Sequence, residues 1–361
     1  MKIIKRGYVT PEQSEGFRYH AWPTVISLAD GTLLAAWSGD RLKHICPYGT
    51  VKAARSTDGG YTWGEPYTVL KTPLDNRDAG LCQIGDHIVL TSFATGRPGR
   101  VRFLTHWLHG VRTTEERELV ERGDAAITDA DEARYMGPML AFSTDNGYTF
   151  TEPVHTPITC PHGPTLLKNG EILHVGSLGS TEKGTPGIYA LRIDAKCNIL
   201  SELQCIATKP DAADDAIFCE PYAAEMPNGD ILVAIRMQSK SLNTYTIYLS
   251  RSTDGGKTFS KPQPTGWHGM PPHIYVTARG EVIMAYGCRE CHRMGVYARI
   301  SRDNGYTWGE ELLLRDDCVD WDLGYPTTTE NKDGDLVTVY YMKDKKGLHE
   351  NRIQYVIWNL D

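Results

Sequence analysis

The chain has 361 residues, of which 40% are hydrophobic, and its 38 Lys and Arg against 45 Asp and Glu give a net charge of −7. This charge argues against nucleic acid or an anionic membrane as a partner, although a local arginine cluster can still attract an anionic ligand. No segment approaches the roughly 18 consecutive apolar residues of a membrane-spanning helix, and residues 1–6 do not resemble a signal peptide, so we expect a cytoplasmic protein, or a secreted or periplasmic one if a leader has been removed.

The chain is expected to begin with a strand near residues 3–8 and to continue with six β-hairpins. Each hairpin joins two apolar strands through a short turn that contains Gly. The six begin at Ile26, Gly80, Thr165, Ala223, Tyr275 and Thr327, and the copy at Gly80 is the least regular. Apolar alternation on both sides of a glycine turn is typical of hairpins.

Four octets with the pattern Ser-x-Asp-x-Gly-x-Thr-aromatic follow four of these hairpins. They are STDGGYTW from Ser56, STDNGYTF from Ser143, STDGGKTF from Ser252 and SRDNGYTW from Ser301. The Asp can bind backbone amides of a turn, Gly or Asn can adopt a positive φ, and the aromatic ring can pack under the hairpin. Four copies of one turn indicate a repeat architecture. We therefore predict an all-β fold, a six-bladed β-propeller formed by residues 1–361 as one domain, in which residues 3–8 complete the last blade.

One segment interrupts the repeat inside the second blade. Residues 113–134 are rich in Glu, Arg and Ala, with a helix expected from about Thr114 to Glu121. This insertion is either a solvated excursion or a lid at the rim of the central cleft.

The nine cysteines are odd in number and widely spread, which indicates reduced thiols. Cys288, Cys291 and His292 match the spacing of a haem-attachment motif, but haem attachment requires export, and the motif lies inside a predicted hairpin. A zinc site on the same three residues plus one distant ligand is an alternative, with only half of the usual four-ligand pattern present.

The octets resemble the Asp-box of sialidases and related propellers, and the resemblance to the sialidase superfamily covers essentially the whole chain. It implies that the octets are structural turns between the third and fourth strands of a blade. It also implies a site where the innermost strands converge, with about one functional residue per blade, and no need for a metal or cofactor.

The resemblance assigns roles to residues in blades four to six. Glu220, which precedes a turn and a strand that ends at Arg236, matches the residue that activates the nucleophile, and Arg236 matches an arginine that binds the substrate carboxylate. Arg293 lies eight residues before an octet and matches a second such arginine, with Arg289 as a rival. Tyr325 matches the nucleophile that opens the sixth hairpin, although Pro follows it where the family commonly has Ser.

These residue types suit the chemistry of an acidic sugar. A carboxylate on the anomeric carbon would repel an Asp or Glu nucleophile, whereas a neutral Tyr avoids that repulsion and a nearby Glu can take its proton. Arg offers a bidentate fork for the substrate carboxylate. Each residue also has a plain structural reading: half-buried packing for Tyr325, a strand cap for Glu220, and salt bridges between blades for Arg236 and Arg293.

Blade one departs from the family. Its first arginine is missing, because Ala21 and Trp22 stand where Arg and Ile are expected; Arg18, three residues upstream, is a possible substitute. The family's acid/base Asp corresponds by position to His44, and Asp40 is a rival in the same loop. A histidine can perform general acid/base work near neutral pH.

Two further residues could line the pocket, Asp78 in blade two and His162 in blade three, although ordinary packing explains them equally well. The leading hypothesis is an exo-acting retaining glycoside hydrolase that removes a terminal acidic sugar, such as sialic acid, from a carbohydrate. One alternative is a polysaccharide lyase in which His44, Tyr325 and Arg236 perform β-elimination on a uronate. Another is a non-catalytic glycan-binding propeller.

Overall fold

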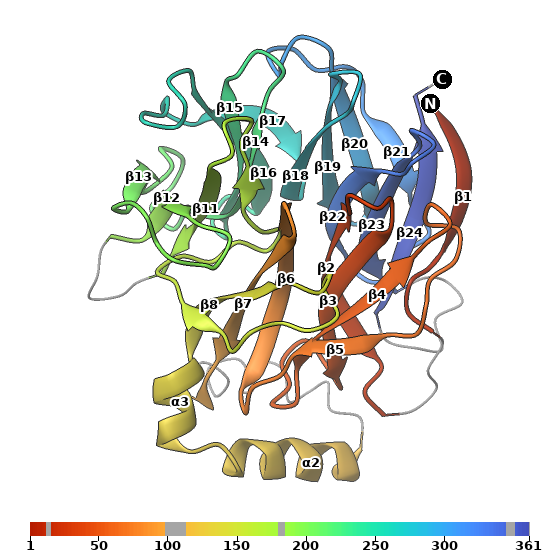
Figure 1. The fold of residues 1–361 in the computed structure, drawn as a ribbon, viewed down its shortest axis with the longest axis vertical. Helices are drawn as coiled ribbons and strands as arrows, with labels where there is room; N and C mark the ends of the chain where they lie inside the picture. Colours follow the sequence, from red (N-terminus) through yellow and green to blue (C-terminus); the bar gives the residue numbers. More distant parts are fainter. Residues whose placement is uncertain (12–15, 98–112, 180–184, 344–350, 361) are drawn as a thin grey trace.

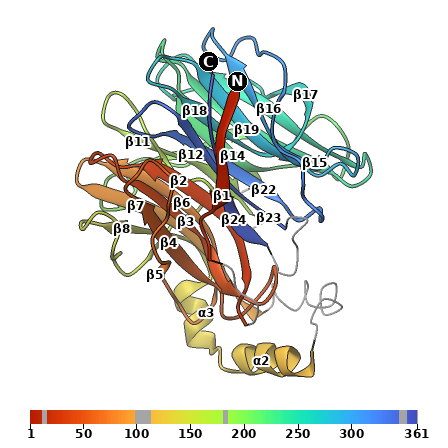
Figure 2. The same cartoon turned by 90° about the vertical axis from the view of Figure 1, so that its right-hand side faces the viewer.

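The computed structural model describes residues 1–11, 16–97, 113–179, 185–343 and 351–360. Its strands form six antiparallel sheets of four strands each, and the sheets are arranged as the blades of a ring (Figure 1, Figure 2). The six-bladed β-propeller predicted from the repeats is therefore confirmed.

In blades one to five the first strand along the chain is innermost. In blade six the innermost strand is β22, and the outermost strand is the N-terminal β1. The first three blades are built from β2 (Tyr19–Ser27), β3 (Leu33–Arg41), β4 (Thr50–Ser56) and β5 (Tyr67–Leu70); β6 (Asp75–Ile84), β7 (His87–Thr95), β8 (Gly137–Ser143) and β9 (Val154–His155); and β10 (Thr165–Leu166), β11 (Ile172–Leu178), β12 (Gly187–Ile193) and β13 (Gln204–Ala207). The last three are built from β14 (Ile217–Glu225), β15 (Ile231–Ser239), β16 (Thr244–Ser252) and β17 (Gln263–His268); β18 (Met270–Val276), β19 (Val282–Cys288), β20 (Gly295–Ser301) and β21 (Leu312–Arg315); and β22 (Gly324–Glu330), β23 (Leu336–Met342), β24 (Arg352–Asn359) and β1 (Lys2–Tyr8).

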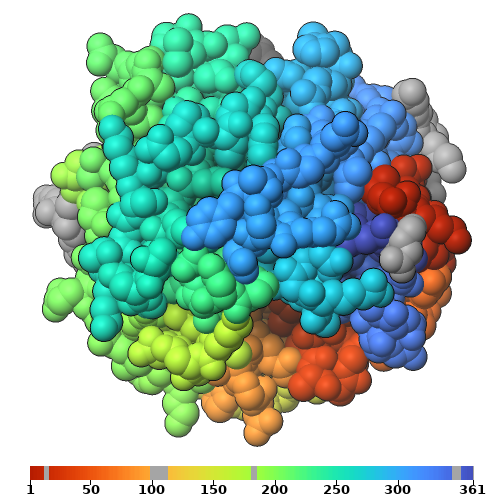
Figure 3. Space-filling model, turned by 90° about the horizontal axis from the view of Figure 1, so that it is seen from above, coloured from red at the N-terminus to blue at the C-terminus, as the bar shows by residue number. Residues whose placement is uncertain are grey.

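The ring closes through the N-terminal strand. β1 pairs antiparallel with β24, with Ile3 opposite Trp358 and Tyr8 opposite Gln354, as the sequence predicts. In the space-filling view the colours follow the chain around the outline, from orange through yellow-green, green and blue to red (Figure 3). Closure places the first strand on the open edge of the last blade, which removes an unpaired strand edge.

The four octets are structural turns, as the resemblance implies. In the first, Ser56 Oγ donates to Asp58 Oδ1 at 2.8 Å and Thr62 Oγ1 donates to Asp58 Oδ2 at 2.6 Å, while the Gly60 amide donates to Ser56 Oγ. The same bonds recur in the other three octets. Each octet follows the third strand of its blade and leads to the fourth.

The hydrophobic core is divided among the interfaces between blades. One cluster joins Val25 and Trp37 of blade one to Val339 and Ile357 of blade six, and each of the other five neighbouring pairs shares a cluster of its own. Alternate side chains of a strand point to opposite faces of its sheet, so each blade supplies one face to each neighbour. The blades are therefore mutually dependent for burial, as in other repeat folds.

The part of the blade-two insertion that the structure describes contains two helices between β7 and β8. Helix α2 (Thr114–Ala125) begins at the cap residue Thr113 and runs beyond the predicted end at Glu121; α3 (Asp129–Tyr135) follows it (Figure 1). Val120 of α2 packs with Leu42 and Cys46. The helix therefore supports the loop that carries His44. Within the described ranges, none of the helices is long and apolar enough to cross a membrane.

Candidate functional site

Four side chains are aimed by backbone irregularities in the innermost strands. The pairing register is interrupted in β2, β6, β14 and β22, each time beside a residue with a positive φ. These residues are Trp22 (φ 55°), Asp78 (56°), Glu220 (46°) and Tyr325 (52°). A β-bulge re-aims a side chain and is common beside active sites, and such strained residues, at a cost of roughly 1–3 kcal/mol each, cluster where function needs them. Equivalent bulges in four blades therefore mark a candidate site.

The bulges also distinguish the two ends of the central channel. We call the end at which they lie the bulge mouth. The residues that follow the bulges along the same strands, such as Thr24, Tyr222 and Thr328, line a shared cavity with residues of the other innermost strands. We call this opposite end the far mouth.

Tyr325, Glu220 and Arg236 form a hydrogen-bonded unit at the bulge mouth. The Tyr325 hydroxyl donates to Glu220 Oε1 at 2.5 Å, and Arg236 Nη1 donates to Glu220 Oε2 at 2.5 Å. Arg236 also donates to Gln238 Oε1 and lies 5.4 Å from the centre of the Tyr245 ring. The fold thus brings three residues that the sequence analysis singled out into direct contact. Two of them, Glu220 and Tyr325, are 105 positions apart in the chain.

The electrostatics of this unit describe a resting state. Burial raises the pKa of the Tyr325 phenol well above its usual value, and the Glu220 charge raises it further. Burial alone would raise the pKa of Glu220, but the charge of Arg236 and the bond from Tyr325 hold it below its usual value. The unit therefore consists of a neutral phenol that donates to an ionised carboxylate.

Asp78 is a second carboxyl group at the bulge mouth. Burial, and then the charge of Glu220, raise its pKa to about 7, although Arg77 and Arg41 oppose this. Two nearby carboxyl groups do not both ionise readily. The structure thus places Asp78, a pocket candidate from the sequence, where its charge state is linked to that of Glu220.

Arg289 lies beside this unit, whereas Arg293 turns away. Arg289 Nη2 donates to the Tyr341 hydroxyl at 3.0 Å, and its charge contributes to the lowered pKa of Glu220. Arg293 forms an ion pair with Glu311, which precedes the outermost strand of blade five. The structure therefore places Arg289, and not Arg293, beside the Tyr325–Glu220–Arg236 unit.

A cavity of about 390 Å³ opens beside Arg289. Arg289 and Tyr245 line it, and so do Cys288, Cys291 and His292 of the haem-like motif. Within the part of the chain that the structure describes, no group of three or more His, Cys, Asp or Glu side chains could hold a metal ion. This gives the zinc alternative no support.

His44 is held by a polar cluster that the sequence did not reveal. Its Nδ1 lies 3.1 Å from the Tyr19 hydroxyl and 3.8 Å from Asp322 Oδ2. Tyr19 donates its proton to Asp322 Oδ2 at 2.7 Å, and Tyr341 donates to Asp322 Oδ1 at 2.8 Å. Because the Tyr19 proton is already used, His44 Nδ1 must be the donor to Tyr19.

The pKa of His44 results from opposing influences. Burial lowers it, the bond with Asp322 raises it, and the charges of Arg77 and Arg41 lower it, so that it lies below its usual value. Burial would raise the pKa of Asp322, but His44 and Arg289 hold it well below its usual range. His44 is thus a mostly neutral imidazole oriented by an ionised carboxylate.

Asp40 and Arg18 are bound to other parts of the fold. Asp40 accepts a hydrogen bond from Thr50 Oγ1 at 2.8 Å and pairs with Lys52, both on β4. Arg18 pairs with Glu116 of α2 at 3.6 Å. The structure groups His44, rather than Asp40, with the bulge mouth, because the His44 and Trp22 rings lie 4.8 Å apart.

Trp22 fills the region where the resemblance predicts an arginine. Its buried ring lies 4.2 Å from the Arg77 guanidinium and 5.1 Å from that of Arg41. Both arginines donate to the His44 carbonyl at 2.7 Å, and Arg41 pairs with Asp75. Blades one and two therefore carry positive charge on Arg41 and Arg77, and the Trp22 indole ring lies against both guanidinium groups.

His162 lies between the two mouths. Its ring centre is 6.1 Å from that of Tyr325 and 5.4 Å from that of His273, and the side chain lines the cavity of the far mouth. The sequence predicts His162 as a residue of the site of blade three; the structure places it under Tyr325, facing the opposite cavity.

A sequence signal for the bulges was available but unused. A proline follows the innermost-strand position in blades one, three, four and six, at Trp22, Gly163, Glu220 and Tyr325, and blade five has two consecutive prolines, Pro271 and Pro272, at its own register shift. Gly163 also has a positive φ, of 96°. This repeated residue-proline pair would have singled out Trp22. No comparable local pattern marks Tyr19, Asp322 or Tyr341.

Solved structures with the same fold include proteins of several kinds. A protein of unknown function from Dyadobacter fermentans aligns over 100% of this chain and 99% of its own, with 20% identity and a TM-score of 0.76. The intramolecular trans-sialidase from Ruminococcus gnavus aligns over 98% and 96%, with 16% identity and a TM-score of 0.62. The α-L-arabinanase of Penicillium chrysogenum aligns over 99% of both chains, with 16% identity and a TM-score of 0.63. At these identities the likeness shows the shared fold.

Comparison with curated proteins gave no match. The family model described as "BNR repeat-like domain" matches residues 124–338, which is more than half of the chain. Its match spans three of the octets, and the fold is that of the sialidases among the solved structures. The chain therefore belongs to the BNR repeat-like domain family.

Proposed function

We propose that the protein is an exo-acting retaining glycoside hydrolase that removes a terminal acidic sugar from a glycan. The observation that carries this proposal is the Tyr325–Glu220–Arg236 unit, in which a phenol, a carboxylate and a guanidinium are joined by hydrogen bonds of 2.5 Å. Arg289 and a cavity of about 390 Å³ lie beside it. The shared fold with a trans-sialidase and an arabinanase supports a glycan as the substrate.

Substrate binding itself would activate the phenol. A sugar carboxylate that binds to Arg236 and Arg289 competes with Glu220 for the guanidinium of Arg236. Glu220 then loses the charge that lowers its pKa, while its burial remains. Its pKa rises, and Glu220 becomes a stronger base toward the Tyr325 proton. The nucleophile is thus activated only when an anionic sugar is in place.

The reaction would then follow the double displacement of retaining enzymes. The Tyr325 oxygen attacks the anomeric carbon while its proton passes to Glu220, and the bond to the leaving oxygen breaks. The protonated form of His44 gives a proton to the departing oxygen and becomes neutral, with Nδ1 held by Tyr19 and Asp322. Water then attacks the glycosyl-tyrosine, His44 takes the water proton, and Tyr325 recovers its own from Glu220.

A panel of aryl glycosides tests the proposal. Sialosides, glucuronides and galacturonides should include a substrate, whereas the matched neutral glucosides and galactosides should not be turned over. Tyr325→Phe should lower kcat at least about 10³-fold, because it removes only the attacking oxygen. Tyr222→Phe, a matched change on the far-mouth side of β14, should keep kcat within about twofold. Near-normal turnover by Tyr325→Phe would overturn the nucleophile assignment.

A second candidate function is a polysaccharide lyase, and the His44–Tyr19–Asp322 cluster favours it. An imidazole oriented by a carboxylate can remove a proton from carbon beside a uronate carboxyl group that an arginine neutralises. A lyase produces an unsaturated uronate with a characteristic ultraviolet absorbance, and a hydrolase does not. An absorbance increase on a uronate polymer, with no release of a reducing acidic monosaccharide, would replace the first proposal by this one.

A further inference from the structure

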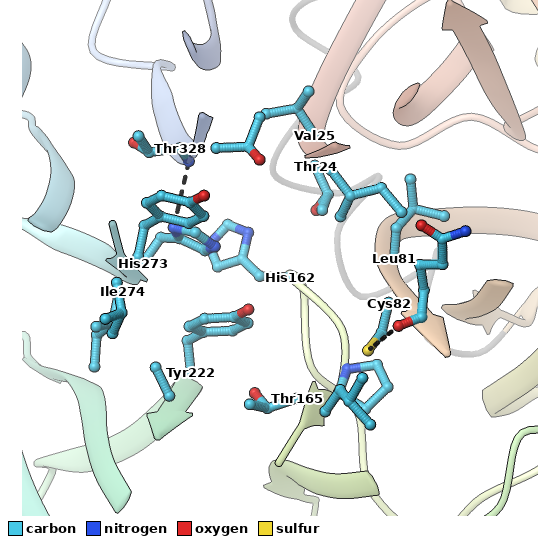
Figure 4. Close-up of a pocket in the computed structure, with 18 of the residues that line it drawn as sticks. Thr24, Val25, Leu81, Cys82, His162, Thr165, Tyr222, His273, Ile274 and Thr328 are labelled. Carbon is cyan, nitrogen blue, oxygen red and sulfur yellow. Dashed lines mark hydrogen bonds between the residues drawn. The ribbon is translucent and has the colours of Figure 1, made fainter. Parts of the chain in front are cut away.

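The far mouth of the channel holds a cavity of about 410 Å³ that the proposed reaction does not use. All six innermost strands contribute to its wall, and His162 forms part of its inner end (Figure 4). Pockets for small ligands usually begin at about 300 Å³. The space is therefore large enough for one sugar-sized molecule.

The charged groups at the rim of this cavity are bound to the protein itself. Lys168 Nζ donates to the carbonyls of Met226 and Pro227, at 2.7 and 3.0 Å. Glu225 Oε2 accepts the Lys168 amide at 2.6 Å. Both rim charges are thus already engaged with neighbouring backbone groups.

The inner end of the cavity presents hydrogen-bonding atoms that are buried and unsatisfied. His162 is 1% exposed, and neither of its ring nitrogens has a partner among the described residues. His273 stacks on Tyr222 with ring centres 4.3 Å apart, and its Nδ1 accepts the Thr328 amide at 3.3 Å (Figure 4). His273 Nε2 must therefore carry its proton. A buried polar group without a partner costs about 1–3 kcal/mol, so the site favours a ligand that supplies the missing bonds.

The chemistry of these atoms selects the ligand. Neutral His162 offers one N–H and one lone pair, and His273 offers an N–H, a combination that hydroxyl groups match because each hydroxyl both donates and accepts. Burial lowers the pKa of His162 to about 3 even though Glu220 raises it, so no positive charge attracts an anion. The negative charge of Glu220 also opposes an anionic ligand.

We propose that the far mouth is a second binding site, for a neutral, hydroxyl-rich molecule of monosaccharide size. The ligand's hydroxyl groups bond to His162 and His273, and its body lies between the Tyr222 side and the Thr24 side of the cavity. The site is separate from the proposed catalytic unit, and its occupancy does not depend on the identity of the sugar that the bulge mouth accepts.

The test uses full-length protein carrying Tyr325→Phe, so that no sugar is consumed. D-glucose, D-galactose and D-mannose are each titrated against D-glucuronate and D-galacturonate while the side-chain ¹⁵N signals of the histidines are followed by NMR. At least one neutral sugar should shift the His162 and His273 signals in a saturable way, and the uronates should not. The bulge mouth is distinguished because its ligands would shift His44 instead.

Two pairs of variants complete the experiment. His162→Phe should weaken neutral-sugar binding at least tenfold, whereas His174→Phe, which changes a buried histidine of β11 outside the cavity, should leave it within twofold. Ser27→Trp should close the cavity from its rim and abolish binding, whereas Ser27→Ala should not. If every neutral sugar fails to shift His162, so that the cavity holds ordered water only, or if Ser27→Trp binds as well as Ser27→Ala, the proposal is wrong. Either result leaves the turnover tests of the bulge mouth unaffected.

Discussion

The two mouths of the channel are built by the same six strands, yet they differ in charge and in backbone geometry. β14 illustrates the contrast: Glu220, near its start, lies on a bulge with φ 46° and bonds to Tyr325 and Arg236, whereas Glu225, at its end, lies in regular pairing and accepts a backbone amide. Charged partners gather where the ladder is interrupted, because a bulge aims a side chain along the channel and a regular strand aims it into the next blade.

Burial also has opposite consequences at the two mouths. At the far mouth it acts almost alone and keeps His162 and His273 neutral, since their pKa values fall below the usual one. At the bulge mouth, Arg236 keeps Glu220 ionised, and His44 with Arg289 keeps Asp322 ionised, despite the same burial. The comparison teaches that burial alone does not decide charge in this protein; the nearest partner does.

The largest expected effect separates the two glutamates of β14. Glu220→Gln should lower kcat roughly 10²- to 10⁴-fold, because the Tyr325 proton loses its acceptor. Glu225→Gln should keep kcat within about twofold. Steady-state kinetics on the acidic glycoside found in the panel measures both. Equal losses in the two variants would mean that Glu220 acts through the fold and not through the reaction.

The next largest effect concerns His44, the proposed general acid. His44→Ala should lower kcat/KM roughly 10²-fold on substrates with a poor leaving group and much less on activated aryl glycosides, since only the former need the proton. A general acid must be protonated, so activity should fall as pH rises through the His44 pKa, which lies below 6.5. Asp40→Asn, a change four residues away near the end of β3, is the matched control. If Asp40→Asn alone shows the leaving-group dependence, Asp40 is the acid.

The arginines should show a smaller, ligand-specific effect. Arg236→Ala and Arg289→Ala should each weaken binding of a carboxylate ligand by about 1.5–3 kcal/mol, or roughly 10- to 150-fold. The methyl ester of the same ligand should lose much less. Arg293→Ala should change neither, because Arg293 is paired with Glu311. Titration calorimetry measures the binding free energy of the carboxylate ligand and of its methyl ester in each variant. Equal losses for both ligands would mean that the arginines hold the blades together.

The smallest effect is on the pH dependence of the free energy of unfolding, and it concerns Asp78. Its pKa is about 7 in the folded protein and 3.8 as its ordinary value. The unfolded chain therefore releases this proton first, and the free energy of unfolding falls as pH rises from about 4 to 7. Asp78→Asn should remove this loss and raise the free energy of unfolding at pH 8 relative to pH 5 by roughly 2–3 kcal/mol. Urea denaturation at the two pH values measures it; an unchanged difference would show that Asp78 is not held near neutrality.

The sequence by itself determined the fold and the central pair of the candidate site. Octets and glycine turns act over a few residues, since each turn is closed by its own side chains, as Asp58 and Thr62 show. Their repetition at matching places sets the number of blades. Tyr325 and Glu220 were located by the resemblance to sialidases, because both precede a turn of the repeat on an innermost strand.

Only the tertiary structure decided which charged side chains meet. Arg289 and Arg293 are four residues apart, and no local rule says which one turns inward; Tyr341 on the next blade and Glu311 at the outer strand settle it. His44 owes its orientation to Asp322, and Tyr19 bonds to that same carboxylate from 303 positions away. Loop side chains follow the partners that the closed ring brings near them, and those partners lie on other blades, beyond the reach of any local pattern.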